Sequence, residues 1–165
     1  MKIRHFTLSA AIAALFFASP QVMAGEQSRL NSQLTELRLA TASFHSLPNA
    51  IEAGWTEDLT GCLANPALGG GMGHHYVNWD IFFDGEVDAL QPELLVYVPT
   101  PNGGLKLGAV EYLVFDSALN GPVPELFGQT FHFNPGIQAW VLHVWLWRGN
   151  PDGLFADWNP TVSCD

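Results

Sequence analysis

Three residues in separate runs of the chain have the chemistry to hold a metal ion together: His75, Glu111 and His143. His75 follows a glycine-rich stretch, whereas Glu111 and His143 each lie within an apolar run. Two imidazole nitrogens and one carboxylate oxygen can bind a divalent transition metal and leave coordination positions open. We therefore predict a site for one transition metal ion, with zinc, copper and iron as the candidates. Met72 and His74 are candidate additional ligands, and a thioether ligand would favour copper.

The alternation of residue types predicts that these three side chains point inward from β-strands. Successive side chains of a strand point to opposite faces, so every second residue shares an environment. Glu111 lies on the more apolar face of the run 105–115. The other two faces consist of His75, Val77, Trp79, Ile81 and Phe83 in the run 74–83, and of Ala139, Val141, His143, Trp145 and Trp147 in the run 138–148.

A carboxylate buried at position 111 requires a partner, because burial of an unpaired charge is costly. Lys106 and Arg148 are the cations in the predicted strands, and both fall on the face opposite to the inward one. The remaining partners for Glu111 are imidazoles, hydroxyls, indole or backbone N–H groups, and a metal ion.

Two other interpretations fit the same residues. His75, Glu111 and His143 could form a hydrogen-bonded network in the core without a metal, or Glu111 and His143 could act as an acid/base pair with shifted pKa values. No His-x-His or His-Glu-x-x-His spacing is present in the sequence. The alternative function is a non-enzymatic module that binds a small ligand or has a structural role. Its aromatic pocket would include Tyr76, Trp145 and Trp147.

Hydrophobic spacing and turn residues predict the elements that must position these side chains. We expect an α+β fold, with N-terminal helices packed on a mostly antiparallel β-sheet or partly closed β-barrel of about five to seven strands. The glycine-rich stretch is interpreted as a flexible approach to a strand. The helices are expected over 26–43 and 46–53, an irregular segment over 55–68, and strands over 74–83, 94–98, 105–115 and 138–148, with a short extended segment over 131–133.

The N-terminus has the pattern of a secretory signal peptide. Lys2 and Arg4 precede an apolar stretch that is shorter than the roughly 20 residues needed to span a bilayer. Small residues end at Ala24, so we predict cleavage there. Residues 1–24 are then the signal peptide, and residues 25–165 form a single globular domain in the periplasm or in the secreted fraction.

Cysteine content and charge restrict the compartment and the partners. Cys62 and Cys164 are the two cysteines of the chain, and in an oxidising compartment we expect them to form a disulfide. Beyond Ala24 four Lys and Arg residues face sixteen Asp and Glu, which gives a net charge of 4 − 16 = −12. Such a chain repels phosphate backbones and anionic lipids. We therefore expect no nucleic-acid partner and no membrane association after cleavage, and a metal ion or small molecule as the partner.

Several short motifs resemble those of a family of exported proteins of unknown function. The similarity extends from about Ala40 to Cys164. It implies a secreted single-domain protein and gives no mechanism. Cupins also place His and Glu ligands on strands, but this chain lacks their His-x-His spacing and their second glycine–proline motif. The motifs that carry the resemblance are Met72-Gly73-His74-His75-Tyr76, Glu111-Tyr112, Leu142-His143-Val144-Trp145-Leu146-Trp147, Asn150-Pro151-x-Gly153-x-Phe155 and Asn159-Pro160-x-Val162-Ser163-Cys164.

Overall fold

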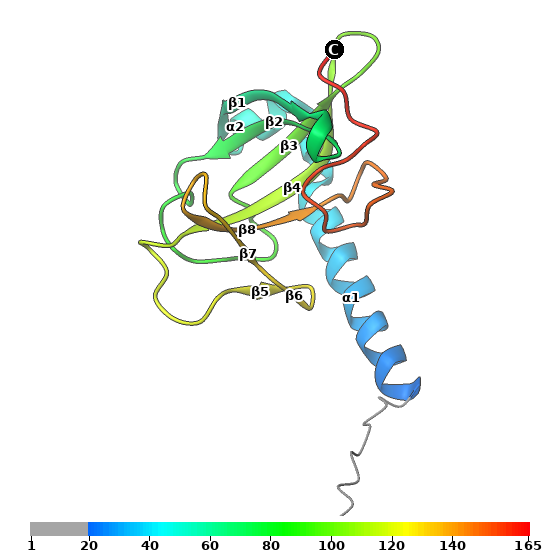
Figure 1. The fold of residues 1–165 in the computed structure, drawn as a ribbon, viewed down its shortest axis with the longest axis vertical. Helices are drawn as coiled ribbons and strands as arrows, with labels where there is room; N and C mark the ends of the chain where they lie inside the picture. Colours follow the sequence, from blue (N-terminus) through cyan, green and yellow to red (C-terminus); the bar gives the residue numbers. More distant parts are fainter. Residues whose placement is uncertain (1–19) are drawn as a thin grey trace, which may run out of the picture.

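A long N-terminal helix leads into a strongly curled antiparallel β-sheet in the computed structural model, which describes residues 20–165 (Figure 1). The sheet has six strands in the order β1-β2-β3-β4-β8-β7, and β5 and β6 form a separate two-stranded hairpin. This is the α+β fold predicted from the sequence. The helices are α1 (Pro20–Thr41), η1 (Ala42–His45), α2 (Leu47–Glu52) and η2 (Pro66–Leu68). The strands are β1 (Trp55–Asn65), β2 (Gly70–Asn78), β3 (Leu94–Pro99), β4 (Leu105–Phe115), β5 (Glu125–Leu126), β6 (Gln129–Thr130), β7 (His132–Asn134) and β8 (Ala139–Val144).

The helices cover one face of the sheet and form the larger hydrophobic core with it. Leu34 and Leu37 of α1 are buried against strand residues that include Tyr97 and Tyr112. Their helical spacing correctly predicted α1, although the helix begins at Pro20, six residues earlier than expected. Leu39, in the same helix, is 75% exposed and faces solvent. We call this side of the sheet the helix face.

The opposite side of the sheet, which we call the cavity face, carries two smaller clusters of buried apolar residues. One cluster surrounds Val77, Leu94 and Leu113. The other contains Val96 and Trp145. The three predicted metal ligands lie between them, as described below. The cavity face is therefore packed less continuously than the helix face.

The prediction of an irregular segment over 55–68 is wrong, because residues 55–65 form the edge strand β1. Most side chains of β1 are exposed or half-buried, so its sequence lacks the apolar alternation that would predict a strand. Its pairing with β2 also contains register shifts, which disturb any regular period.

The glycine-rich stretch is part of strand β2 and does not form a flexible approach to it. A Cβ atom at Gly70 would lie 2.3 Å from the carbonyl oxygen of Asn159, and one at Gly73 would lie 2.4 Å from that of Tyr97. The glycines therefore allow neighbouring backbone to approach closely. Strand β2 then ends at Asn78, earlier than predicted.

The predicted inward face of Trp79, Ile81 and Phe83 is wrong, because the chain leaves the strand there. The carbonyl oxygen of Asn78 accepts hydrogen bonds from the N–H groups of Ile81 and Phe82, which closes a tight turn. Phe82 is the residue that this turn buries.

The C-terminal tail is attached to strands β1 and β2 by a disulfide and by backbone hydrogen bonds. Cys62 of β1 forms the predicted disulfide with Cys164. Asn159 exchanges two backbone hydrogen bonds with Gly71. No helix within residues 20–165 is long and apolar enough to cross a membrane. The predicted signal peptide falls largely on residues 1–19, outside the described part of the chain.

Candidate metal centre

The three predicted ligands come together on the cavity face of the sheet. Glu111 on β4 lies directly opposite His143 on β8. His75 lies on β2, on the far side of β3, so strand spacing alone would separate its backbone from that of Glu111 by roughly 10 Å. The curl of the sheet and the length of the two side chains close this distance above β3, where the paired residues are Val96 and Leu94.

Both imidazoles direct Nε2 toward the same carboxylate oxygen. The distance from Glu111 Oε2 is 3.5 Å to His75 Nε2 and 3.6 Å to His143 Nε2. These distances are longer than an N–H···O hydrogen bond. They are close to the separation of about 3.4 Å between two ligand atoms bound at about 2.1 Å to one tetrahedral ion. All three side chains are buried, and one ligand atom of each lies within 4.8 Å of the others.

Thr60 of β1 contacts the imidazole of His75 at Nδ1, the ring nitrogen that points away from Glu111. A register shift in the β1–β2 ladder lies between Asp58 and Cys62, next to His75, and brings Thr60 Oγ1 to 3.1 Å from His75 Nδ1. The Thr60 hydroxyl proton is donated to the carbonyl of Gly61, so its oxygen accepts from His75. His75 therefore carries its proton on Nδ1 and presents the Nε2 lone pair to the site.

Asp157 in the C-terminal tail holds His143 in the same way. Its Oδ1 lies 3.2 Å from His143 Nδ1, and its Oδ2 lies 2.9 Å from His132 Nε2. A carboxylate only accepts hydrogen bonds, so His143 also carries a proton on Nδ1. A carboxylate or hydroxyl behind a histidine is the usual outer support of a metal ligand.

Burial and neighbouring charges shift the pKa values of all three residues. Burial and the proximity of His143 lower the pKa of His75 to about 3, so its ring is neutral. Burial raises the pKa of the Glu111 carboxyl. Burial opposes a charge on His143, but Glu111 and Asp157 raise the pKa of that imidazole above its ordinary value. The pair formed by Glu111 and His143 therefore binds a positive charge strongly, and a metal ion competes with protons for it.

The polar atoms of the site are arranged to receive a cation. His143 Nε2 is buried and has no hydrogen-bond partner among residues 20–165. The ion-pair partners of Glu111 within these residues are the two imidazoles, and neither lysine nor arginine is among them. Two imidazole nitrogens and a carboxylate oxygen thus converge in a buried site, an arrangement that can hold a metal ion in place of the proton that Glu111 and His143 attract.

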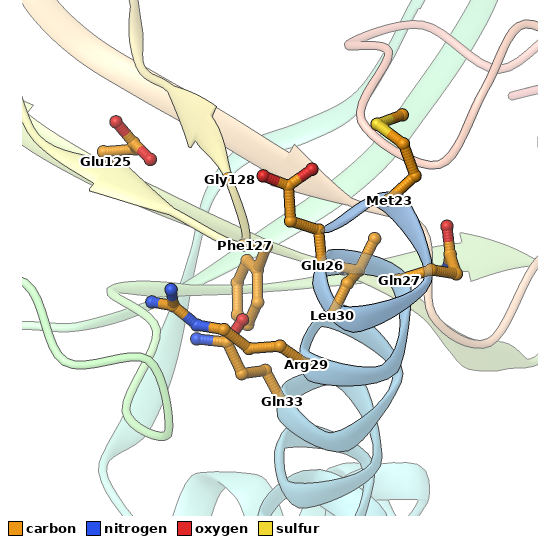
Figure 2. A pocket seen from close by; sticks show the side chains of 9 residues that line it. All are labelled: Met23, Glu26, Gln27, Arg29, Leu30, Gln33, Glu125, Phe127 and Gly128. Carbon is orange, nitrogen blue, oxygen red and sulfur yellow. The ribbon is translucent and has the colours of Figure 1, made fainter. Parts of the chain in front are cut away.

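The site opens into an apolar cavity of about 490 Å³ on the cavity face. Met72 lines this cavity beside the three ligands, so it remains a candidate for the same site. A second groove of about 430 Å³ lies between α1 and the β5–β6 hairpin, where Figure 2 shows Glu26, Arg29 and Gln33 beside Phe127. None of the three ligands lines that groove, and it has no comparable set of ligand atoms within residues 20–165.

Other residues predicted for the site lie elsewhere. His74 points away from the cluster and binds Asp58, with 2.7 Å between Nδ1 and Oδ2, so its prediction as a metal ligand is wrong. Adjacent strand residues face opposite sides, which separates His74 from His75. Asp58 also accepts the N–H of Gly61, so His74 supports the segment that carries Thr60.

The three aromatic residues predicted to line a ligand pocket do not border the cavity. Tyr76 packs on Tyr97 of the helix face. Trp145 is buried on the cavity face but away from the opening, whereas Trp147 packs on His45 of η1. Strand β8 ends at Val144, so the alternation that grouped the two tryptophans does not continue to them.

Sequence reasoning missed the outer partners of the histidines. Thr60 lies in a segment without strand periodicity, and Asp157 and His132 lie in segments far apart along the chain. Thr60 could be identified only from the disturbed β1–β2 register. Asp157 carried no signal beyond its position in an aspartate- and asparagine-rich tail.

Comparison with known proteins adds no family to this description. No protein-family model matches the chain, and neither a curated protein nor a solved structure matches it. The resemblance to a family of exported proteins therefore remains a prediction.

Proposed function

We propose that this protein binds one divalent transition metal ion through His75, Glu111 and His143, and that it does so outside the cytoplasm. The observation that carries the proposal is the convergence of two buried Nε2 atoms on the Glu111 carboxylate, at distances that suit coordination better than hydrogen bonding.

The donor set favours zinc or iron and leaves copper as an outcome of the test. Two imidazoles and a carboxylate with open positions are used by catalytic zinc sites and by non-haem iron(II) sites. Both cysteines are in the disulfide, so no thiolate within residues 20–165 competes for the ion. When bound, such an ion supplies a Lewis acid at the inner end of the apolar cavity.

The disulfide supports the proposed location. Cys62 and Cys164 are bonded, and a bond of this kind persists in oxidising compartments. The predicted signal peptide agrees with export.

The decisive experiment compares the metal content of the wild-type protein with that of Glu111→Leu. The full chain is expressed with its own N-terminus, purified from the exported fraction and analysed by mass spectrometry of the elements. We expect about one ion per wild-type chain and less than about a tenth of that in the variant. Leucine removes one partner of the buried Glu111–His143 pair, which costs about 3 to 5 kcal/mol, so thermal unfolding first establishes that the variant is folded.

His45→Gln is the matched control, since His45 is an exposed histidine of η1 that packs on Trp147. It should retain the full metal content. Equal metal in the wild type and Glu111→Leu would disprove the assignment of the site. Negligible metal in both after reconstitution with zinc and iron(II) would leave the alternative, a core network in a module that binds a small ligand or has a structural role.

A further inference from the structure

We propose that the cavity above the metal centre binds an apolar, ring-bearing small molecule that reaches the metal through a single oxygen-donor group. The oxygen contact rests on the proposed function, because it requires the ion. The apolar contact rests on the cavity alone, so the two can be tested separately.

Exposed apolar side chains are concentrated at this cavity. Eleven large hydrophobic residues are exposed within residues 20–165. Five of them line the cavity: Leu59, Leu63, Trp79, Phe83 and Ile137. Single exposed apolar residues need no explanation, but a contiguous group of them marks a binding site. Three separate parts of the chain contribute to the group, so it is a feature of the folded protein.

Four aromatic side chains form one wall of the cavity and offer a flat surface: Trp79, Phe82, Phe83 and Phe115. Phe83 is stacked on Phe115 with 5.2 Å between ring centroids, and on Trp79 with 5.9 Å. Phe82 packs edge-on against Phe115. The indole N–H of Trp79 is held by Glu57, so the rings are oriented before any ligand arrives. Stacking against such rings favours a planar ligand.

The polar groups of the cavity restrict the ligand further. They belong to the metal cluster and its surroundings, namely His75, Glu111, His143, Thr60, Asp157 and Asn134. Neither lysine nor arginine within residues 20–165 lines the cavity, so a phosphate or a polyanion would have no counter-charge apart from the metal ion. A sugar would lack hydrogen-bond partners along the apolar wall. One small donor group, directed at the metal, is what this lining accommodates.

The size of the cavity agrees with this ligand class. A volume of about 490 Å³ lies within the range of small-molecule sites. Phe115 lies four residues beyond Glu111 on the same strand and the same face, which corresponds to about 13 Å along β4. A molecule with one or two rings can span from the aromatic wall to the cluster.

The test uses two probes with the same oxygen-donor head, benzohydroxamate and acetohydroxamate, titrated into the metal-loaded full chain by calorimetry. We expect benzohydroxamate to bind about 10- to 100-fold more tightly, because its ring is buried against the wall. Phe83→Ser should abolish this preference and leave the affinity for acetohydroxamate unchanged. Phe83 is 62% exposed, so the fold does not depend on it, and Ile137→Ser serves as a second variant. Leu39→Ser on α1 is the control for loss of an exposed apolar side chain.

A neutral dye without an oxygen donor, N-phenyl-1-naphthylamine, separates the cavity from the metal. We expect its fluorescence to rise with both the wild type and Glu111→Leu, and much less with Phe83→Ser. Dye binding by a wild type that takes up no metal would support the apolar site and reject the proposed metal function together with the oxygen contact that depends on it. Equal binding of the two hydroxamates, with no dye binding by the wild type, would overturn the present proposal while the metal site stands.

Discussion

The two faces of the curled sheet use their buried residues in opposite ways. On the helix face, residues such as Leu37 and Tyr97 close a continuous apolar core under α1 and α2. On the cavity face the apolar clusters are smaller, and three polar side chains are buried between them. Apolar packing stabilises the fold in proportion to the area it buries, whereas buried polar groups reduce that stabilisation unless they are satisfied. The difference indicates that the helix face contributes most of the apolar stabilisation, whereas the cavity face holds the buried polar cluster of the proposed metal site.

The same difference explains why the cavity face needs a covalent support. No helix of residues 20–165 covers it, and the tail that supplies Asp157 is held by Asn159 and by the disulfide. The helices over the helix face, α1, η1 and α2, follow one another directly in sequence. The tail, by contrast, returns from a distance of 102 residues between Cys62 and Cys164.

The largest expected effect comes from removing this covalent support. The double variant Cys62→Ser/Cys164→Ser should lose about 4 to 5 kcal/mol in the free energy of unfolding, because the disulfide closes a loop of 102 residues. Urea denaturation of the metal-free protein measures the loss. Ser163→Ala, in the same exposed tail, is the control. An unchanged urea midpoint in the double variant would mean that the cavity face is stable without the disulfide.

A second comparison sets the two buried glutamates against each other. Glu111 faces two imidazoles, whereas Glu93 accepts a hydrogen bond from the N–H of Leu113, just beyond the point where β3 stops pairing with β4. Burial raises the pKa of Glu93 to about 8, and the charges of Asp84 and Glu111 act in the same direction. Glu93 is therefore a neutral hydrogen-bond acceptor at neutral pH.

This protonation predicts how stability depends on pH. As pH rises above about 4.5, the unfolded chain releases the Glu93 proton while the folded chain retains it, so stability falls until about pH 8. Glu93→Gln keeps an acceptor for Leu113 and removes this loss. We expect the variant to exceed the wild type by on the order of 3 kcal/mol at pH 8 and to match it near pH 4.5.

Urea denaturation at the two pH values measures the difference in the free energy of unfolding between Glu93→Gln and the wild type. The histidines titrate in both proteins, so their contribution cancels in this difference. Glu125→Gln, at an exposed glutamate of the β5–β6 hairpin, is the control and should show no such pH dependence. A constant difference between Glu93→Gln and the wild type at both pH values would show that Glu93 is ionised in the folded protein.

The sequence was sufficient for the parts of the molecule that follow a period. Alternation along residues 105–115 put Glu111 on its correct face, and the leucine spacing identified α1. The grouping of His75, Glu111 and His143 could be predicted because each lies within a strand, where every second side chain points to the same face. His74 and His75 are adjacent, so any strand must separate them.

The sequence was insufficient where tertiary contacts decide the local conformation. Edge strand β1 has few buried residues to produce a pattern, and Gly70 is explained only by a tail about ninety residues away. The turn after Asn78 interrupts an apolar run that alternation alone would continue. The outer partners Thr60 and Asp157 were missed for the same reason, since neither position has a periodic environment.

The smallest expected effect is that of replacing Asp157. The Asp157→Asn variant tests whether His143 binds a metal ion or only takes part in a hydrogen-bond network of the core. Asp157→Asn removes the carboxylate that fixes His143 and bonds His132, while it leaves a side chain of the same shape. Loss of such an outer partner lowers metal affinity by about 10- to 100-fold, or about 1.4 to 2.7 kcal/mol. Competition with a chromogenic chelator measures this change, and Asp152→Asn, at an exposed aspartate of the same tail, is the control.

If His143 only packs the core, Asp157→Asn should reduce the free energy of unfolding of the metal-free protein and leave metal affinity unchanged. A fall in affinity with unchanged metal-free stability would instead mean that the tail is held over the cavity face to orient His143 toward an ion.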